Sequence, residues 1–250
     1  MAEEEKIREH AKKALLGLTD KKKGWKRRLI DFFWEVFIII VAINLTLWFH
    51  NWSDKRHDRE LEKDFLIGIR DDLSIVKRNL EHGLEVYQPT LDYYDSVWIQ
   101  INEYRIDKAF VDTNSGYLVN TAYFTFDNSR FENFKSSGYL RLIENDSLSM
   151  YITNLYTVTL PWDVSRDKSV FEDRQRDFVT YIGSKVRRDS SGTWIVSDLL
   201  NVPEVQFQIQ LQKDILYERK RQKQGTLQVV KGMITLIDNE LKNRFGYKEK

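Results

Sequence analysis

LIDFFWEVFIIIVAINLTLWFHNW, residues 29–52, is the stretch that decides the fold of this chain. A helix needs about 20 mostly apolar residues to cross the hydrocarbon core of a bilayer, and residues 29–49 supply that length. No small-residue cleavage site follows, which favours a retained anchor over a signal peptide. A buried core helix is the alternative, but the flanking aromatic and charged residues favour a transmembrane helix over residues 29–52.

Charges and tryptophans beside this stretch predict its orientation. The basic cluster KKKGWKRR at residues 21–28 precedes it, whereas the residues after it mix cations with carboxylates. Loops rich in Lys and Arg stay in the cytoplasm, so residues 1–28 are expected inside and residues 53–250 outside. Within the inner segment, residues 2–19 predict an amphipathic helix or a frayed tail. The predicted interface anchors are Trp25, Arg27 and Arg28 on the inner side and Trp48 and Trp52 on the outer side.

Polar residues interrupt the predicted span and indicate a face that packs against protein. Charges within a span usually face protein or water, and small or hydroxyl residues let helices approach closely. On a helical wheel Asp31, Glu35 and Thr46 share one face with Ala42, and Asn44 lies opposite. Two alternatives are that the carboxylates reach the cytoplasmic interface, or that Glu35 carries protons in an ion-coupled motor. The predicted packing stripe is Asp31, Glu35, Ala42 and Thr46.

Composition bounds the rest of the chain. Residues 53–250 are enough for one domain with a core. Only 3 prolines and 11 glycines interrupt the 250 residues, and 31% are charged, which favours long solvated helices over a β-sandwich. The chain has no cysteine, which excludes disulfides, iron–sulfur clusters and thiol nucleophiles. The predicted fold class is all-α, with one N-terminal transmembrane helix followed by a helical bundle.

Apolar spacing and turn residues divide the first part of this bundle. A helix is expected from residue 53 to about Tyr87, where Pro89 ends it, and Thr90 caps another to about Tyr104. Residues 107–116 predict a solvated loop, and residues 117–134 favour a helix over a strand. The apolar stripe of the first helix packs inside the bundle or, alternatively, forms a coiled coil with a second copy. Its members are Ile69, Leu73, Val76, Leu80 and Tyr87.

The second part also predicts helices. Gly138 ends one helix as a left-handed cap, and Asn145 or Asp146 begins the next, which stops before Pro161. A long helix is expected over residues 162–188, followed by a turn and a short extended segment near Trp194. Pro203 opens a helix to about Gln224, Gly225 and Thr226 break or bend it, and a last helix ends before Gly246. The residues expected in the core of the helix before Pro161 are Leu148, Tyr151, Ile152 and Leu155.

Motifs that carry catalysis or metal binding are missing from the sequence. The four histidines lack metal-ligand spacing, and no nucleophile elbow, phosphate-binding loop or dinucleotide fingerprint appears. We therefore predict no enzyme and no catalytic, cofactor or metal site. The net charge of +1 gives no argument for nucleic acid as a partner. The basic run at residues 219–223 is expected to be a solvated helix face.

Two segments carry a resemblance to a known family. Glu35 within the span, Asn51-Trp52 with the charged helix after it, and SGYLRLIEN at residues 137–145 are similar to uncharacterised single-pass membrane proteins of Bacteroidota. The match covers the anchor, the next helix and the central segment; the C-terminal part matches only in being helical. The chain departs from the family in its longer charged N-terminal extension and in Thr46-Leu-Trp at the exit. The resemblance implies a bacterial inner membrane and a periplasmic bundle, but no activity.

These observations predict a membrane-anchored helical interaction or scaffold protein. Its expected partners are the lipid bilayer and, through the transmembrane helix, a second copy or another membrane protein. A periplasmic ligand-sensing domain is one alternative. An accessory subunit of an ion-coupled motor or transport complex that uses Glu35 is another.

Overall fold

The computed structural model describes residue 12, residues 25–119 and residues 124–247. Helices make up most of these residues, so the protein is of the all-α class. The amphipathic helix expected over residues 2–19 lies outside the described residues, apart from Lys12, which is helical. The chain divides into two compact units, residues 1–61 and residues 62–250.

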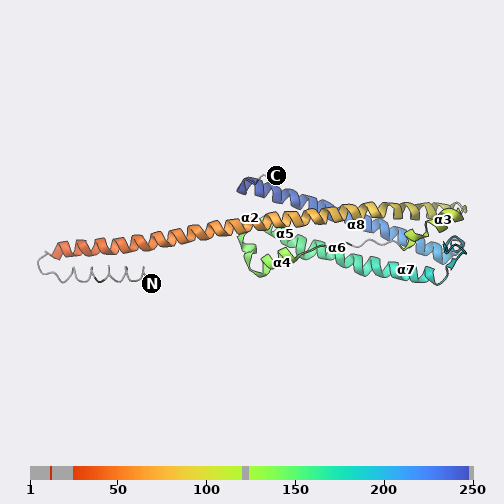
Figure 1. Ribbon diagram of the computed structural model, residues 1–250, viewed down its shortest axis with the longest axis horizontal. Coiled ribbons are helices and arrows are strands. Elements are labelled where there is room, and N and C mark those ends of the chain that lie inside the picture. The colour runs from red at the N-terminus through yellow and green to blue at the C-terminus, as the bar shows by residue number, and fades with distance from the viewer. Residues whose placement is uncertain (1–11, 13–24, 120–123, 248–250) are drawn as a thin grey trace. The chain divides into compact units, whose positions relative to one another are not determined.

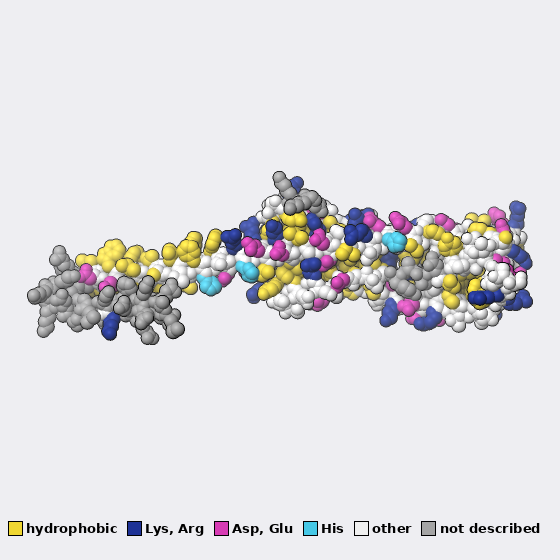
Figure 2. Space-filling view, viewed as in Figure 1, with side chains coloured by type: hydrophobic (Ala, Val, Ile, Leu, Met, Phe, Trp, Pro, Cys, Tyr) yellow, Lys and Arg dark blue, Asp and Glu magenta, His cyan; other side chains and the backbone are white. Residues whose placement is uncertain are grey.

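Helix α2 (Trp25–Asn102) is one unbroken helix of 78 residues (Figure 1). In the first unit, residues 29–52 of α2 carry large apolar side chains that are exposed along the whole stretch. Among the described helices, α2 is the one that is long and apolar enough to cross a membrane. Figure 2 shows apolar side chains gathered along this part of the chain.

Pro89 lies inside α2, so the prediction that it separates two helices is wrong. A proline removes one backbone donor and costs about 3 kcal/mol in a helix interior. The ring of Pro89 is exposed, whereas Tyr87, Thr90 and Leu91 beside it are buried. Packing of these neighbours inside the second unit offsets the cost, because a break here would expose them.

Three long helical runs build the described part of the second unit (Figure 1). The first is α2 from Glu62 onward. The second is continuous and alternates α-helix with two wider π-helical turns. The third is α8, a single helix of 43 residues. The second run consists of α5 (Asp146–Asn154), η3 (Leu155–Thr159), α6 (Leu160–Arg166), η4 (Asp167–Glu172) and α7 (Asp173–Gly183), and the third is α8 (Pro203–Phe245).

Polar contacts fix the direction of α8 against both other runs. Along α2, Glu81 pairs with Lys231 at 2.9 Å and Asp95 pairs with Lys213 at 3.3 Å. Residue numbers thus rise on α2 as they fall on α8, so the two helices are antiparallel. The second run shows the same trend, because Asn145 bonds to Glu240 and Asp163 pairs with Lys223. The second run is therefore parallel to α2 and antiparallel to α8.

The π-helical turn η3 explains why the second run continues past Pro161, where a helix end was predicted. The backbone N–H of Leu160 donates to the carbonyl of Leu155, five residues back. This wider turn makes room for a proline ring beside the preceding carbonyls. The run ends at Gly183, short of the predicted residue 188. Leu148, Ile152 and Leu155 are buried as predicted, but Tyr151 is 47% exposed.

Helix α8 also crosses a predicted break. Gly225 and Thr226 lie within it, so the prediction of two helices is wrong. A glycine costs about 1 kcal/mol relative to alanine in a helix but keeps its backbone donor. Thr226 and Leu227 are buried, and their packing offsets this cost, so the helix is continuous through this point. Gly246 ends α8 in the left-handed conformation, at φ 60°, as predicted.

Short elements cap and connect the long runs. The predicted loop at residues 107–116 is wrong, because Asp107 accepts a hydrogen bond from the N–H of Phe110 and caps a short helix. Only part of the predicted helix at residues 117–134 forms, and residues 124–128 are not helical. Gly138 (φ 72°) and Asn145 cap their helices as predicted. These elements are α3 (Lys108–Thr113), η1 (Ser115–Leu118), α4 (Ser129–Ser136), η2 (Tyr139–Leu142) and η5 (Ser197–Leu199).

A two-stranded hairpin follows the second run. Strand β1 (Arg187–Arg188) pairs antiparallel with β2 (Trp194–Ile195). Its turn is closed by Asp189, whose carboxylate accepts from the N–H groups of Ser191 and Thr193. The extended segment at Trp194 is confirmed, whereas Arg187 and Arg188 were predicted to be helical.

Buried apolar side chains of the described residues form two clusters along the bundle. On α2, one cluster extends from Phe65 to Leu80 and the other from Leu91 to Ile101. The predicted stripe of Ile69, Leu73, Val76, Leu80 and Tyr87 is buried at 5% exposure or less. The chain itself covers this stripe, so it is not available for a coiled coil with a second copy.

Candidate functional site

Four charged side chains lie in the interval between the two apolar clusters. Asp163 and Asp167 come from the second run, and Arg219 and Lys223 come from α8; none is more than 3% exposed. Each pair is spaced i, i+4, so both members lie on one face of their helix. Because the two runs are antiparallel and adjacent, the carboxylates of one meet the cations of the other.

Lys223 is the centre of this buried charge cluster. Its Nζ lies 2.9 Å from Asp163 Oδ1 and 2.9 Å from Asp167 Oδ2. Arg219 Nε donates to the other oxygen of Asp167 at 3.1 Å. The backbone N–H of Phe124 also donates to Asp167, at 3.3 Å. Two cations thus balance two carboxylates, which is the condition for burying charge in a protein interior.

Aromatic rings enclose the two cations. The guanidinium of Arg219 lies 4.9 Å from the ring centre of Tyr87 and 5.0 Å from that of Phe171. Lys223 Nζ lies 4.5 Å from the ring centre of Phe124. Ring faces carry partial negative charge and attract such cations, most strongly where water is excluded. Both the rings and the carboxylates therefore stabilise the two buried cations.

The pairing within the cluster matches the observed register of the second run against α8. No substrate atom reaches its charges in this conformation, because every one of them is buried. The buried positions of α8 recur about every 3.5 residues. If α8 shifted along its neighbours by seven residues, apolar side chains would therefore still be buried. Such a slip would, however, separate Lys223 from both carboxylates. Buried polar groups of this kind specify register at some cost in stability.

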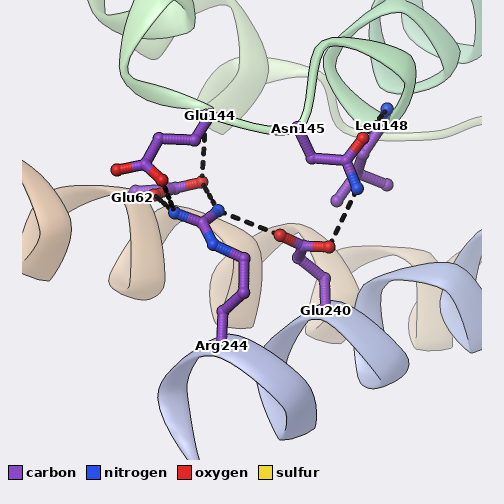
Figure 3. A network of polar contacts seen from close by, with 6 residues as sticks. All are labelled: Glu62, Glu144, Asn145, Leu148, Glu240 and Arg244. Carbon is purple, nitrogen blue, oxygen red and sulfur yellow. Dashed lines mark hydrogen bonds and ion pairs between the residues drawn. The ribbon is translucent and has the colours of Figure 1, made fainter.

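A second polar network joins α2, the start of α5 and the end of α8 (Figure 3). Glu62, 1% exposed, accepts two hydrogen bonds from Arg244, at 2.6 and 3.1 Å. Arg244 also contacts Glu144 and Glu240, and Glu240 accepts from Asn145 at 2.9 Å. The hydrogen bond to Glu62 is the main reason that the pKa of Arg244 is raised above its ordinary value. We call this network the Arg244 clamp.

The predicted packing stripe and outer anchors lie in the exposed part of α2. Thr46 donates to the carbonyl of Ala42 at 2.9 Å, so its hydroxyl is satisfied within its own helix. Glu35 is partly buried and Asp31 is exposed. Trp48 and Trp52 are exposed, at 60% and 53%. The inner anchors Trp25, Arg27 and Arg28 are helical, and their side chains lie outside the described part of the structure.

Sequence reasoning missed both polar networks. The basic run at residues 219–223 was predicted to be solvated, which is wrong for Arg219 and Lys223. The signal was present, because both residues continue the buried stripe of α8 through Gln212 and Leu216. Glu62 likewise lies seven residues before the buried Ile69, in phase with the stripe of α2. A charge in phase with an apolar stripe indicates a buried ion pair.

Within the described residues, the fold and these networks define an all-α protein with one helix long and apolar enough to span a membrane and a helical bundle with charged residues in its interior. Comparison with protein-family models, curated proteins and solved structures found no match. The resemblance to Bacteroidota membrane proteins therefore stays a prediction. Within the described ranges, no group of three or more His, Asp or Glu side chains is arranged to hold a metal ion.

Proposed function

We propose that this chain is a single-pass protein of a bacterial inner membrane, with a cytoplasmic N-terminus and a periplasmic bundle. The observation that carries the proposal is the bare apolar surface of α2 from Leu29 to Trp52. At about 1.5 Å per residue, residues 29–49 extend about 31 Å, close to the thickness of a hydrocarbon core. Exposure of such a large apolar surface to water is unfavourable, whereas its contact with lipid tails is not. Its large exposed side chains are Leu29, Ile30, Phe32, Phe33, Trp34, Phe37, Ile38, Ile40, Val41, Ile43, Leu45, Leu47, Trp48, Phe49 and Trp52.

The role proposed for the bundle is that of an interaction or scaffold protein. The charges in its interior are paired with one another and enclosed by aromatic rings, an arrangement that favours a fixed structure over chemistry on a substrate. The Arg244 clamp is a second set of polar contacts, and it joins the end of α8 to Glu62, the first residue of the bundle unit. A rigid bundle that is held beside a membrane suits a protein that positions other proteins.

The anchor and its orientation can be tested in the full chain, because the absence of cysteine gives a clean background for labelling. Single cysteines are placed at Glu4 and at Lys242, an exposed residue of α8. In intact spheroplasts, a membrane-impermeant maleimide is expected to label Lys242→Cys and to spare Glu4→Cys. Carbonate washing is expected to leave the chain in the membrane. Release by carbonate would overturn the anchor, and the reverse labelling pattern would overturn the orientation.

A ligand-sensing role is the second candidate, because the proposed anchor would leave residues 1–28 on the cytoplasmic side. A sensor needs such a segment to pass a change inward, whereas a scaffold does not. Removal of residues 1–20 separates the two roles. A sensor loses its output while a scaffold still retains its partners, as measured by copurification from membranes.

A further inference from the structure

Three buried polar atoms at the edge of the charge cluster have no hydrogen-bond partner among the described residues. They are Oδ2 of Asp163, the amide oxygen Oε1 of Gln222 and Nε of Arg166. The other buried side-chain atoms of this kind are the hydroxyls of Tyr94 and Tyr156, on α2 and η3. Buried polar groups are nearly always hydrogen-bonded, so the three atoms at the cluster require a partner that the protein itself does not supply.

A hydrogen bond places two of these atoms side by side. Nε2 of Gln222 donates to Oδ1 of Asp163, and Nζ of Lys223 lies 2.9 Å from the same oxygen. The second oxygen of the carboxylate and the oxygen of the amide therefore flank the hydrogen bond between Gln222 and Asp163. Both oxygens accept hydrogen bonds and donate none. One molecule with two donor hydrogens can therefore serve both.

Arg166 brings a donor to the same turn of α6. It follows Asp163 by three residues, so the two side chains lie on one face of the helix. Its guanidinium lies 5.1 Å from the ring centre of Trp162, four residues back. The side chain thus runs toward the N-terminal end of α6, as long side chains in helices do. This path takes the buried Nε–H past Asp163 and close to the two unpaired oxygens.

The chemistry of the three atoms defines what can bind between them. Two of them accept and one donates, so the ligand has to donate two hydrogen bonds and accept one. Water does both. A metal cation would be repelled by Lys223 and Arg166, and an anion would be repelled by Asp163. A neutral water also leaves the balance of two cations and two carboxylates in the cluster unchanged.

We infer that a water molecule is bound between α6 and α8 beside the buried charge cluster. It donates to Oδ2 of Asp163 and Oε1 of Gln222 and accepts from Nε of Arg166. Waters inside proteins typically make about three hydrogen bonds to groups that would otherwise be unpaired, and three such groups are available here. The water links the second run to α8 in addition to the ion pairs of Lys223 and Arg219. Such a site does not depend on the proposed membrane anchor.

A proton on Asp163 is the alternative to the water. Its Oδ2–H would donate to Oε1 of Gln222, and the acid and the amide would share two hydrogen bonds in a ring. This arrangement leaves the Nε–H of Arg166 unpaired. It also leaves the two cations of the cluster buried with one carboxylate, which is unfavourable in a protein interior. The bound water has neither disadvantage.

Magnetic relaxation dispersion of the water oxygen nuclei tests the inference, because it counts water molecules that stay inside a protein. The full chain is measured in detergent micelles. Arg166→Met combined with Gln222→Met removes two of the three partners and is expected to lose the signal of about one such water. Lys168→Met combined with Gln224→Met is the matched control, since it removes one cation and one amide at exposed positions of the same two helical runs and should lose none. An unchanged signal in the first variant would overturn the inference.

A second comparison covers the case in which the double variant does not fold. Circular dichroism shows whether it keeps its helices. If it does not, Gln222→Met alone decides, since it keeps every charge and removes one partner. Loss of that partner should shorten the residence time of the water, and an unchanged dispersion profile would refute the site.

Infrared spectroscopy distinguishes the water from the proton, because a carboxylate and a protonated carboxyl group absorb at different frequencies. The spectrum of Asp163→Asn is subtracted from that of the unchanged chain. The difference is expected to contain carboxylate bands alone, as it should for the control Asp214→Asn, which is exposed on α8. A protonated carboxyl band that disappears in Asp163→Asn would place a proton on Asp163 and refute the bound water.

Discussion

Residues 29–52 of α2, the proposed anchor segment, and the middle of the bundle both depart from the usual arrangement of apolar side chains inside and charged side chains outside. They depart from it in opposite ways. Residues 29–52 present large apolar groups on the outside. The middle of the bundle carries Asp163, Asp167, Arg219 and Lys223 on the inside. A soluble protein normally avoids both arrangements. The proposed anchor segment would need lipid as its solvent, whereas the charge cluster needs only its own partners, so the two regions should respond to different changes.

The largest effect is expected from removing the central cation of the charge cluster. Lys223→Met leaves Asp163 and Asp167 buried with one cation between them. Breaking a buried pair in this way should lower the free energy of unfolding by about 3–5 kcal/mol. Denaturant unfolding of the full chain in detergent micelles, followed by circular dichroism, measures the change.

Two matched variants show whether charge is the cause. Arg221→Met removes a cation two residues away that is 78% exposed and pairs with Glu218, so its effect should stay below about 0.5 kcal/mol. Asp163→Asn combined with Lys223→Met removes one charge of each sign and should recover at least half of the loss. If Lys223→Met and Arg221→Met cost the same, the cluster does not stabilise the bundle.

A slightly smaller effect is expected when a charge is placed on the exposed surface of the anchor. Val41 and Ile75 lie on the same helix and are similarly exposed, at 42% and 49%. Val41→Arg would place a cation near the bilayer centre, at a cost of about 2.5–3.5 kcal/mol, and should reduce the carbonate-resistant fraction. Ile75→Arg faces water and should leave that fraction unchanged. Equal results for the two variants would show that lipid does not surround Val41.

The sequence predicts the fold class well because the fold class depends on apolar periodicity and composition over many residues. Apolar periodicity identifies the stripes of α2 and α8, and composition rules out a β-rich fold. Single breaking residues mislead, because Pro89, Pro161 and Gly225 all lie inside continuous helical runs. At each of these positions the cost of the helix-breaking residue is offset by burial of its neighbours. That burial depends on the folded bundle and cannot be read from the single residue.

The candidate site was less predictable than the fold. Asp163 and Lys223 are 60 residues apart and meet only because two helices are antiparallel. Each looks like an ordinary surface charge until its phase is compared with the apolar stripe. The Arg244 clamp has the same origin, because Glu62 and Arg244 lie at opposite ends of the bundle's sequence. Pairs of charges that are both in phase with buried stripes would have pointed to these sites.

A gain in stability is expected when Pro89, the one proline within α2, is replaced. Pro89→Ala restores a backbone donor at an exposed position and should raise the free energy of unfolding by about 1–2 kcal/mol. Gly83→Ala is the control, because its added Cβ meets no atom within 4 Å and should contribute about 1 kcal/mol by propensity alone. A loss of stability in Pro89→Ala would show instead that the bundle requires the local geometry of the proline.

The smallest effect concerns a contact on the surface of the bundle, between α8 and α2. Tyr217 donates a hydrogen bond to Asp95, which raises the pKa of Tyr217 to about 12. A raised pKa in the folded state means that folding favours the protonated phenol. Its contribution is therefore complete below the ordinary tyrosine pKa of about 10 and is lost as the pH rises through 12. Because Tyr217 is 40% exposed, the contribution should be only about 0.5 kcal/mol.

Tyr217→Phe measures this contribution directly. At pH 8 the variant should be less stable than the unchanged chain by about 0.5 kcal/mol, and the difference should fade between pH 10 and 12. Tyr104→Phe is the control, since Tyr104 is 93% exposed and its substitution should leave the stability at pH 8 unchanged. Stability measured by denaturant unfolding at several pH values decides the matter. A difference that persists unchanged to pH 12 would show that the hydrogen bond donated by the protonated phenol to Asp95 is not its source.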